Sequence, residues 1–207
     1  MRSRRVWEFG GFIAGAVLVA FGAVAIFMGV DGRSTVRDSL KQEQIYFGSV
    51  EDPAVAKYAA KWAEQQVLTG EQARAFANIM RYHTLNAEWN PEHLTYAQMG
   101  RYLAADDPSN PKGTNDEQAA LKDEQGNPVA NSFRNTWVTE TALSTALNVS
   151  YMAEQLSIFG IVVGVALLLT GIGLIILALA VFGRLQPVAE AVLRERGKGK
   201  PAAPALG

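Results

Sequence analysis

Two stretches of the 207-residue chain decide its fold. The first, Phe9–Val30, reads FGGFIAGAVLVAFGAVAIFMGV and contains 22 residues without a charge. The second, Leu156–Gly183, reads LSIFGIVVGVALLLTGIGLIILALAVFG and contains 28. A helix needs about 20 apolar residues to cross the hydrocarbon core of a bilayer. Neither stretch has the polar face of a surface helix in a soluble protein. We therefore expect two transmembrane helices, over residues 9–30 and 155–183.

The start of the first stretch has features of a secretory signal peptide. Basic residues precede it, and Ala23-Val24-Ala25 has the small-residue pattern of a cleavage site. The apolar run, however, continues beyond that pattern through Ile26–Met28. We therefore expect an uncleaved membrane anchor.

Basic residues near the ends of the two stretches predict the orientation. Loops that stay in the cytoplasm carry an excess of lysine and arginine. The terminal segments 1–8 and 184–207 hold eight basic residues, whereas three lie close to the first stretch on its other side. We therefore expect a two-pass plasma-membrane protein with both termini in the cytoplasm and residues 31–154 outside. The basic tail 184–207 would favour anionic lipid head groups. The basic residues compared are Arg2, Arg4, Arg5, Arg184, Arg194, Arg196, Lys198 and Lys200 in the terminal segments, and Arg33, Arg37 and Lys41 on the other side.

Glycines recur with the same spacing in both apolar stretches. In each stretch the second glycine follows the first by four residues and the third follows by seven more, which keeps all three near one face of a helix. Small residues on such a face let two membrane helices approach closely. If the helices are antiparallel and matched in depth, Gly22 lies opposite Gly164, and Gly15 lies opposite Gly171. The six glycines are Gly11, Gly15, Gly22, Gly160, Gly164 and Gly171.

Capping signals divide the region between the spans into short helices. Asp31-Gly32 is typical of a turn, after which Ser34 or Thr35 would cap a short helix. Asp52-Pro53 predicts a helix start, with apolar residues recurring on one face to about Leu68. Thr69 with Gln72 forms a capping box for a helix continuing through His83 to Ala87, and Thr95 with Gln98 forms one for a short helix through Tyr102.

The segment 106–128 is rich in Asp, Asn, Lys, Gly and Pro and lacks periodicity. We expect it to be a long exposed loop, with room for a helical turn at Glu117–Lys122. Neither Pro nor Gly occurs from Val129 to Phe159, so one helix is expected to run from Val129 directly into the second span.

Composition excludes several kinds of chemistry. The chain has no cysteine, which excludes disulfides and thiolate metal sites, and its net charge of −1 argues against a nucleic-acid binder. Its two histidines, His83 and His93, lie near Glu88 and Glu92 but show no metal-ligand spacing. We expect no catalytic residues, no metal and no cofactor.

Large apolar side chains between the spans supply a core or the lining of a pocket. The candidates are Trp62, Phe76, Met80 and Trp137. A closed pocket lined by them would favour a small-molecule or lipid binding or sensing module, whereas a solid core would favour a domain that binds through its surface.

Four segments also carry a family resemblance. They are DGRSTV at 31–36, TGEQAR at 69–74, TYAQMGR at 95–101 and WVTETAL at 137–143. They resemble segments of a group of uncharacterised two-span membrane proteins of actinobacteria and related high-GC bacteria. The similarity covers about residues 9–180. It implies the two-span topology and a bacterial origin, and no activity.

These features predict an all-α membrane protein in which two antiparallel transmembrane helices flank an extracytoplasmic helical domain. We expect a non-catalytic protein whose outer domain takes part in protein–protein contact, as an accessory or assembly subunit of a larger membrane complex. Its expected partners are the lipid bilayer and either another membrane protein or a second copy. The alternative is the small-molecule or lipid binding or sensing module of the cell envelope.

Overall fold

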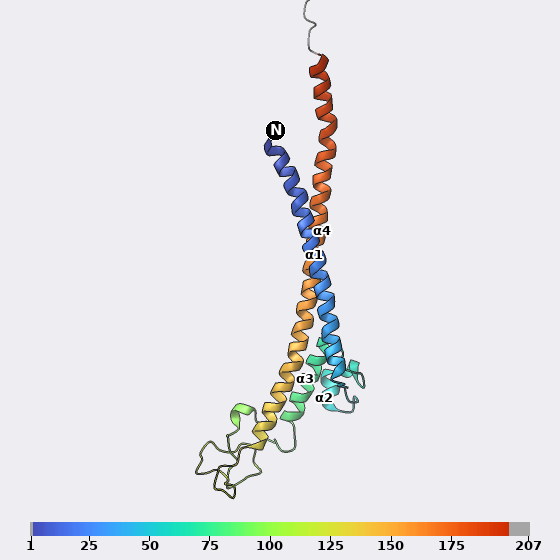
Figure 1. The fold of residues 1–207 in the computed structure, drawn as a ribbon. Coiled ribbons are helices and arrows are strands. Elements are labelled where there is room, and N and C mark those ends of the chain that lie inside the picture. The colour runs from blue at the N-terminus through green and yellow to red at the C-terminus, as the bar shows by residue number, and fades with distance from the viewer. Residues whose placement is uncertain (1, 199–207) are drawn as a thin grey trace, which may run out of the picture. The chain divides into compact units, whose positions relative to one another are not determined.

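The structure is a computed structural model that describes the backbone of residues 2–198 and the side chains of residues 10–180. Residues 1 and 199–207 of the two expected tails lie outside it. The described chain is helical, with isolated β-bridges and no strand (Figure 1). In chain order its elements are α1 (Arg2–Gln42), α2 (Pro53–Tyr58), the 3₁₀ helix η1 (Ala60–Trp62), α3 (Gly70–Leu85), the 3₁₀ helix η2 (Tyr96–Gln98) and α4 (Ser132–Lys198).

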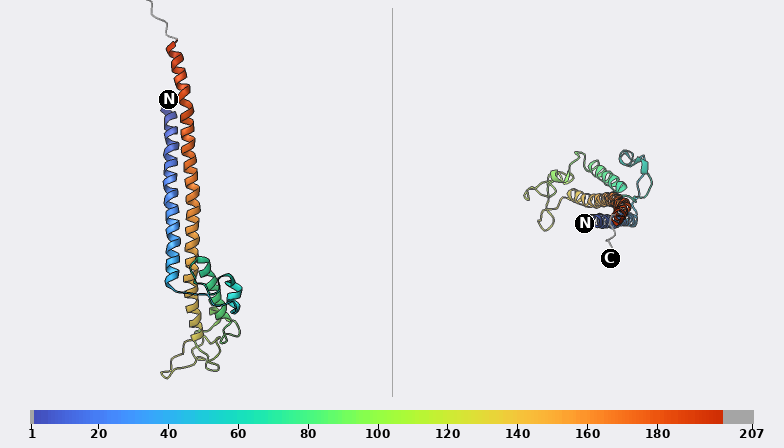
Figure 2. Two further views of the ribbon diagram at one scale, coloured as in Figure 1. Left: turned by 90° about the vertical axis from the view of Figure 1, so that its right-hand side faces the viewer. Right: turned by 90° about the horizontal axis from the view of Figure 1, so that it is seen from above.

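Two of these helices are long and apolar enough to cross a membrane, α1 over Gly10–Gln42 and α4 over Ser132–Ala180. Both are continuous in Figure 2, where α1 is blue and α4 runs from yellow to red. The chain divides into two compact units. We call them the helix pair, made of residues up to Val30 and from Ile158 onward, and the helical domain, Asp31–Ser157.

The expected turn at Asp31-Gly32 is wrong, because α1 continues without a break to Gln42. Gly32 serves close packing here, since a Cβ at this position would lie 2.5 Å from Ser157 Oγ. Val36 and Leu40 follow on the same helix face, where Leu40 is buried in the core of the helical domain and Val36 is partly buried against it. Because this face is buried, a sequence that is locally typical of a turn is helical here.

The helix after Asp52-Pro53 begins where expected and ends earlier. Asp52 Oδ1 accepts a hydrogen bond from the Ala54 N–H at 2.8 Å. The helix α2 stops at Tyr58 rather than near Leu68. The chain then forms η1, and Gln65–Val67 lies beside Ile45–Phe47, with Phe47 N–H donating to Gln65 O at 3.0 Å and Val67 N–H to Ile45 O at 2.9 Å. This long-range pairing overrides the helical period of the sequence.

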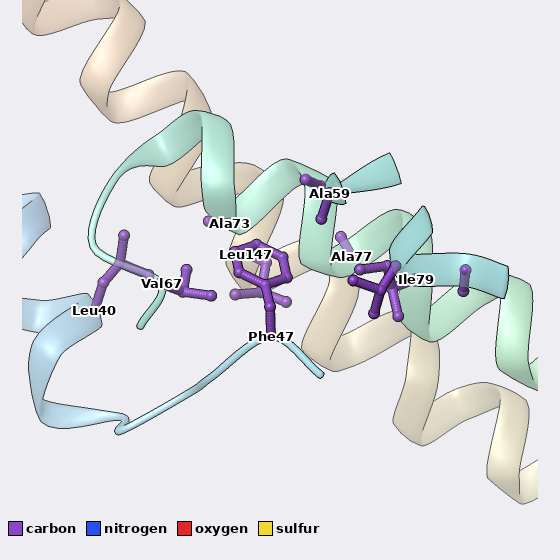
Figure 3. Close-up of a cluster of buried hydrophobic side chains, with 11 residues drawn as sticks. Leu40, Phe47, Ala59, Val67, Ala73, Ala77, Ile79 and Leu147 are labelled. Atoms are coloured by element: carbon purple, nitrogen blue, oxygen red, sulfur yellow. The ribbon is translucent and has the colours of Figure 1, made fainter. Parts of the chain in front are cut away.

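The main core of the helical domain is built around α3. The capping box of Thr69 and Gln72 starts this helix as expected, and the helix ends at Leu85. Figure 3 shows the core side chains gathered from α1, α3, α4 and the segments between them. Its buried members are Leu40, Phe47, Ala54, Val55, Ala59, Val67, Ala73, Ala75, Ala77, Ile79 and Leu147.

A second, smaller core lies around Trp137, which is 1% exposed and packs with Leu94 and Met99. The Trp137 Nε1–H donates to Leu94 O at 3.0 Å. Burial of the Trp137 indole therefore joins α4 to the turns that follow α3.

The 3₁₀ helix η2 ends at Gln98, four residues before the expected Tyr102.

The segment 106–128 contains no helix, so the prediction of a helical turn at Glu117–Lys122 is wrong. Residues within it pair instead with residues 102–105: Ala105 N–H donates to Ala119 O at 3.0 Å and Leu121 N–H to Leu103 O at 2.8 Å. Although most of the segment is exposed, Ala120 is buried. The segment is a loop with isolated backbone pairing to the residues that precede it.

Asn131 joins this loop to the start of α4. Its Nδ2 donates to the carbonyl oxygens of Gly100 at 3.1 Å and Pro111 at 2.9 Å. Its Oδ1 accepts from the Phe133 N–H at 3.1 Å. Because an asparagine oxygen satisfies a free N–H group at a helix start, α4 begins at Ser132 rather than at Val129.

Candidate functional site

Two cavities in the helical domain are the candidate sites. The first, which we call the polar cavity, has a volume of about 520 Å³. The second, the apolar cavity, has a volume of about 410 Å³. The polar cavity is lined by Arg33, Ser34, Arg37, Gln65, Gln66, Leu68, Thr69, Gln72 and Glu154. The apolar cavity is lined by Ser39, Leu40, Glu43, Ile45, Phe76, Met80, Leu143, Ala146, Leu147 and Ser150.

Glu154 of α4 forms the floor of the polar cavity and links three helices. Its side chain is 9% exposed. Oε2 accepts a hydrogen bond from the backbone N–H of Gly70 at 2.6 Å, and Oε1 lies 3.4 Å from Nη2 of Arg33. A carboxylate at the start of α3 also meets the positive end of that helix's dipole. The buried charge is therefore compensated from α1 and from α3.

Gly70 makes this contact geometrically possible. A Cβ on Gly70 would lie 2.7 Å from Tyr151 Cα and 2.9 Å from Glu154 Oε2. Only glycine therefore lets the first turn of α3 approach the backbone of α4 closely enough for the Glu154 hydrogen bond.

Several backbone donors around the start of α3 are satisfied locally. Gln72 Oε1 accepts hydrogen bonds from the backbone N–H groups of Leu68 at 2.8 Å and Thr69 at 3.0 Å. Thr69 Oγ1 accepts from the Gln72 N–H at 3.2 Å. The start of α3 is thus hydrogen-bonded through its own capping residues and through Glu154. The positive charge of the cavity comes from the two arginines that line it.

The apolar cavity has a different chemistry. Phe76 and Met80 of α3 line it together with Leu147 of α4, and Leu143 at its edge is 51% exposed. Ser39, Glu43 and Ser150 are its polar lining residues. An apolar surface with a polar rim suits an apolar ligand or an apolar side chain of another protein.

The four aromatic and methionine candidates do not line one pocket. Phe76 and Met80 lie in the apolar cavity. Trp62 stacks on Phe47, with ring centroids 6.1 Å apart and planes at 17°, and belongs to the edge of the main core. Trp137 lies in the second core. A closed pocket shared by all four is therefore absent from the helical domain.

The candidate glycines lie between α1 and α4 of the helix pair. A Cβ on Gly15 would lie 2.7 Å from Gly171 O, and one on Gly22 would lie 2.6 Å from Gly164 O. The reciprocal distances are 2.6 Å from Gly171 to Gly15 O and 2.7 Å from Gly164 to Gly22 O. These are the two pairs that the spacing matches by depth.

The two outer glycines have more room. A Cβ on Gly11 would be 3.9 Å from Ala178 Cβ, and one on Gly160 would be 3.7 Å from Ala25 O. Both distances are ordinary van der Waals contacts. Of the six candidate glycines, only the Gly15–Gly171 and Gly22–Gly164 pairs are therefore too close to the facing helix to admit a Cβ.

The two histidines lie apart in separate hydrogen bonds. His83 Nε2 lies 2.9 Å from Asp52 Oδ2, and His93 Nδ1 lies 2.8 Å from Leu85 O. Partial burial raises the pKa of Asp52, but hydrogen bonds from His83 and the Ala54 N–H outweigh it and hold that pKa below its ordinary value. Among the described residues, no three His, Asp or Glu side chains gather as a metal site would require.

Sequence reasoning missed the polar cavity. Arg33 and Arg37 were considered there only as charges that predict the orientation. Position 154 appeared there only as the last residue of the region between the spans. One signal was present: Glu154 is the last charged residue before the second apolar stretch, and Arg33 follows the first stretch closely. In an antiparallel helix pair those positions are neighbours.

The chain was also compared with known proteins. No family model, no curated protein and no solved structure matches it.

Proposed function

We propose that the protein is a two-pass plasma-membrane protein whose helical domain lies outside the cell and binds another envelope protein without catalysing a reaction. Both apolar helices keep most of their side chains exposed, which is costly in water and favourable in lipid. The excess of basic residues in the two terminal segments supports a cytoplasmic position for both.

The glycine contacts support an antiparallel hairpin within the membrane. The lower-numbered glycine of α1, Gly15, meets the higher-numbered glycine of α4, Gly171, and the order reverses for Gly22 and Gly164. Without a hydrophobic driving force in lipid, close packing of small residues is a main source of helix association. The hairpin would hold both ends of the helical domain at one membrane surface.

The apolar cavity is the observation that carries the proposed binding role. Leu143 exposes half of its surface beside Phe76 and Met80, although it belongs to the water-facing domain of the proposal. Exposed apolar surface around a recess marks interaction sites on soluble domains. A partner's apolar side chain or amphipathic helix would bury this surface within a rim that includes Glu43.

The same cavity supports small-molecule or lipid binding as the second candidate. Its volume of about 410 Å³ is in the range of ligand pockets, roughly 300–1,000 Å³. An acyl chain or another apolar molecule would meet mainly Ile45, Phe76, Met80 and Leu147.

Cross-linking in cells distinguishes the two candidates. With a photoreactive phenylalanine in place of Leu143, we expect an adduct whose mass includes a second protein. The matched control carries the same probe at Asn148, an exposed residue of α4 that does not line the cavity. The truncation Leu143→Ala should weaken co-purification of that protein about fivefold, corresponding to roughly 1 kcal/mol for one apolar contact at the edge of an interface.

The outcomes separate clearly. An adduct heavier by only a few hundred daltons would favour the small-molecule or lipid candidate. Equal labelling from positions 143 and 148 would contradict both candidates, because the cavity would then have no specific occupant.

A further inference from the structure

The polar cavity contains an unequal balance of charge. Arg33 and Arg37 are four residues apart on α1, so they lie on one face of the helix, and both line the cavity. Its one carboxylate is Glu154, which is buried and hydrogen-bonded through both oxygens. The cavity therefore has an excess of one positive charge.

That positive charge is available to a ligand. Arg33 has five donors and directs one, Nη2, to Glu154 at 3.4 Å, while 51% of its side chain is exposed. Arg37 is exposed and has no carboxylate within 4.0 Å among the residues whose side chains are described. Each guanidinium group presents a planar fork of N–H donors that fits two oxygens of a phosphate, and both arginines line the same cavity.

Amide side chains complete the lining. Gln65 Nε2 donates to Lys61 O at 3.4 Å, and Gln66 Nε2 donates to Lys41 O at 3.1 Å. These bonds fix the amide nitrogens and leave the amide oxygens as acceptors. A ligand that presents hydroxyl groups beside an anionic group would use both the oxygens and the arginines.

We propose that the polar cavity binds the phosphate of an anionic phospholipid head group, with Arg37 as its main contact and Arg33 as the second. The assignment of the phosphate to a lipid depends on the proposed membrane insertion of α1. The binding of an anion depends only on the residues that line the cavity. Arg33 and Arg37 follow Val30, the last residue of the charge-free stretch, by three and seven residues along α1. At about 1.5 Å per residue these are rises of about 5 and 10 Å, which match the roughly 5–8 Å head-group layer once the reach of an arginine side chain is included.

The test uses the full chain purified in a neutral detergent. Binding of phosphatidylglycerol and of phosphatidylcholine with identical acyl chains is titrated by native mass spectrometry. We expect Arg37→Gln to weaken phosphatidylglycerol binding about fivefold, the effect of one basic residue near anionic head groups, and to leave phosphatidylcholine binding unchanged. Arg37→Lys should retain most of the affinity, because the positive charge remains.

Lys41→Gln is the matched control. Lys41 lies one turn beyond Arg37 on α1, is exposed and does not line the cavity, so its loss removes the same charge at a neighbouring position. Equal effects of Arg37→Gln and Lys41→Gln would overturn the site, since they would indicate bulk charge alone. Equal affinity for the two lipids in the unmodified protein would also overturn it.

A water-soluble phosphate is tested separately with glycerol 1-phosphate. If it binds as tightly as phosphatidylglycerol and depends equally on Arg37, the anion site stands and the lipid assignment is overturned. Failure of the lipid test does not affect the proposed partner binding, because cross-linking from Leu143 reads the other cavity.

Discussion

Replacement of Gly22 by leucine is expected to destabilise the purified protein by about 3 kcal/mol, the upper end of the usual cost of overpacking. A Cβ at Gly22 would lie 2.6 Å from Gly164 O and 2.7 Å from Leu168 N. Both are backbone atoms of α4, so no side-chain rotation relieves the contact and the two helices must move apart. Thermal denaturation in detergent, followed by loss of helical circular dichroism, measures the effect.

Gly10→Leu and Gly173→Leu are matched controls. At both glycines the position that a Cβ would take has no neighbouring atom within 4 Å, although both belong to the same two apolar stretches. We expect both variants to melt within a few degrees of the unmodified protein. Equal losses in Gly22→Leu and in these controls would show that leucine disturbs the helices without reference to the glycine contacts.

A disulfide provides a direct readout of the same helix contact. The chain has no cysteine, and the Cβ positions of Gly11 and Ala178 are 3.9 Å apart, within the roughly 3.5–4.5 Å that a disulfide requires. The double variant Gly11→Cys, Ala178→Cys should form an intramolecular disulfide on oxidation. Adding Gly22→Leu should reduce its yield severalfold, which tests helix separation independently of stability.

Removal of the Glu154 carboxylate is the second large effect. We expect Glu154→Ala to cost about 2–3 kcal/mol, because it leaves the buried Gly70 N–H without its acceptor at 2.6 Å and removes the partner of Arg33. Glu154→Gln keeps a hydrogen-bonding oxygen and should cost about half as much. Thermal denaturation of the full chain in detergent checks both values.

Gln155→Ala serves as the comparison for Glu154→Ala. Gln155 is the next residue of α4 and is exposed, so its truncation should change stability by less than about 0.5 kcal/mol. A loss in Glu154→Ala as small as that in Gln155→Ala would mean that the link between α1, α3 and α4 contributes little to the fold.

Local signals predicted the starts of α2 and α3. Asp52 and Thr69 cap α2 and α3, and the uninterrupted composition after Pro128 predicted that one helix would continue into the second apolar stretch. Capping depends on residues within three positions, so a single sequence contains the necessary information. The depth matching of Gly15 with Gly171 and of Gly22 with Gly164 also needed only helix geometry.

Tertiary packing explains what the sequence did not predict. Gly32 was predicted to lie in a turn, but it lies in a helix because it packs closely against Ser157. Residues up to Leu68 follow a helical period, but Gln65–Val67 instead pairs with Ile45–Phe47. The polar cavity joins residues more than eighty positions apart, such as Thr69 and Glu154. No local pattern records such a contact, so the arginines were interpreted only as signals of orientation.

The proposed exposure of the helical domain outside the cell is tested most directly by labelling single cysteines in right-side-out membrane vesicles. The cysteine-free chain provides the background for Gln118→Cys in the exposed loop and Ser3→Cys near the N-terminus. With a membrane-impermeant maleimide, we predict labelling at position 118 in intact vesicles and at position 3 only after permeabilisation. Labelling at position 3 in intact vesicles, with position 118 protected, would contradict the proposed topology and the function inferred from it.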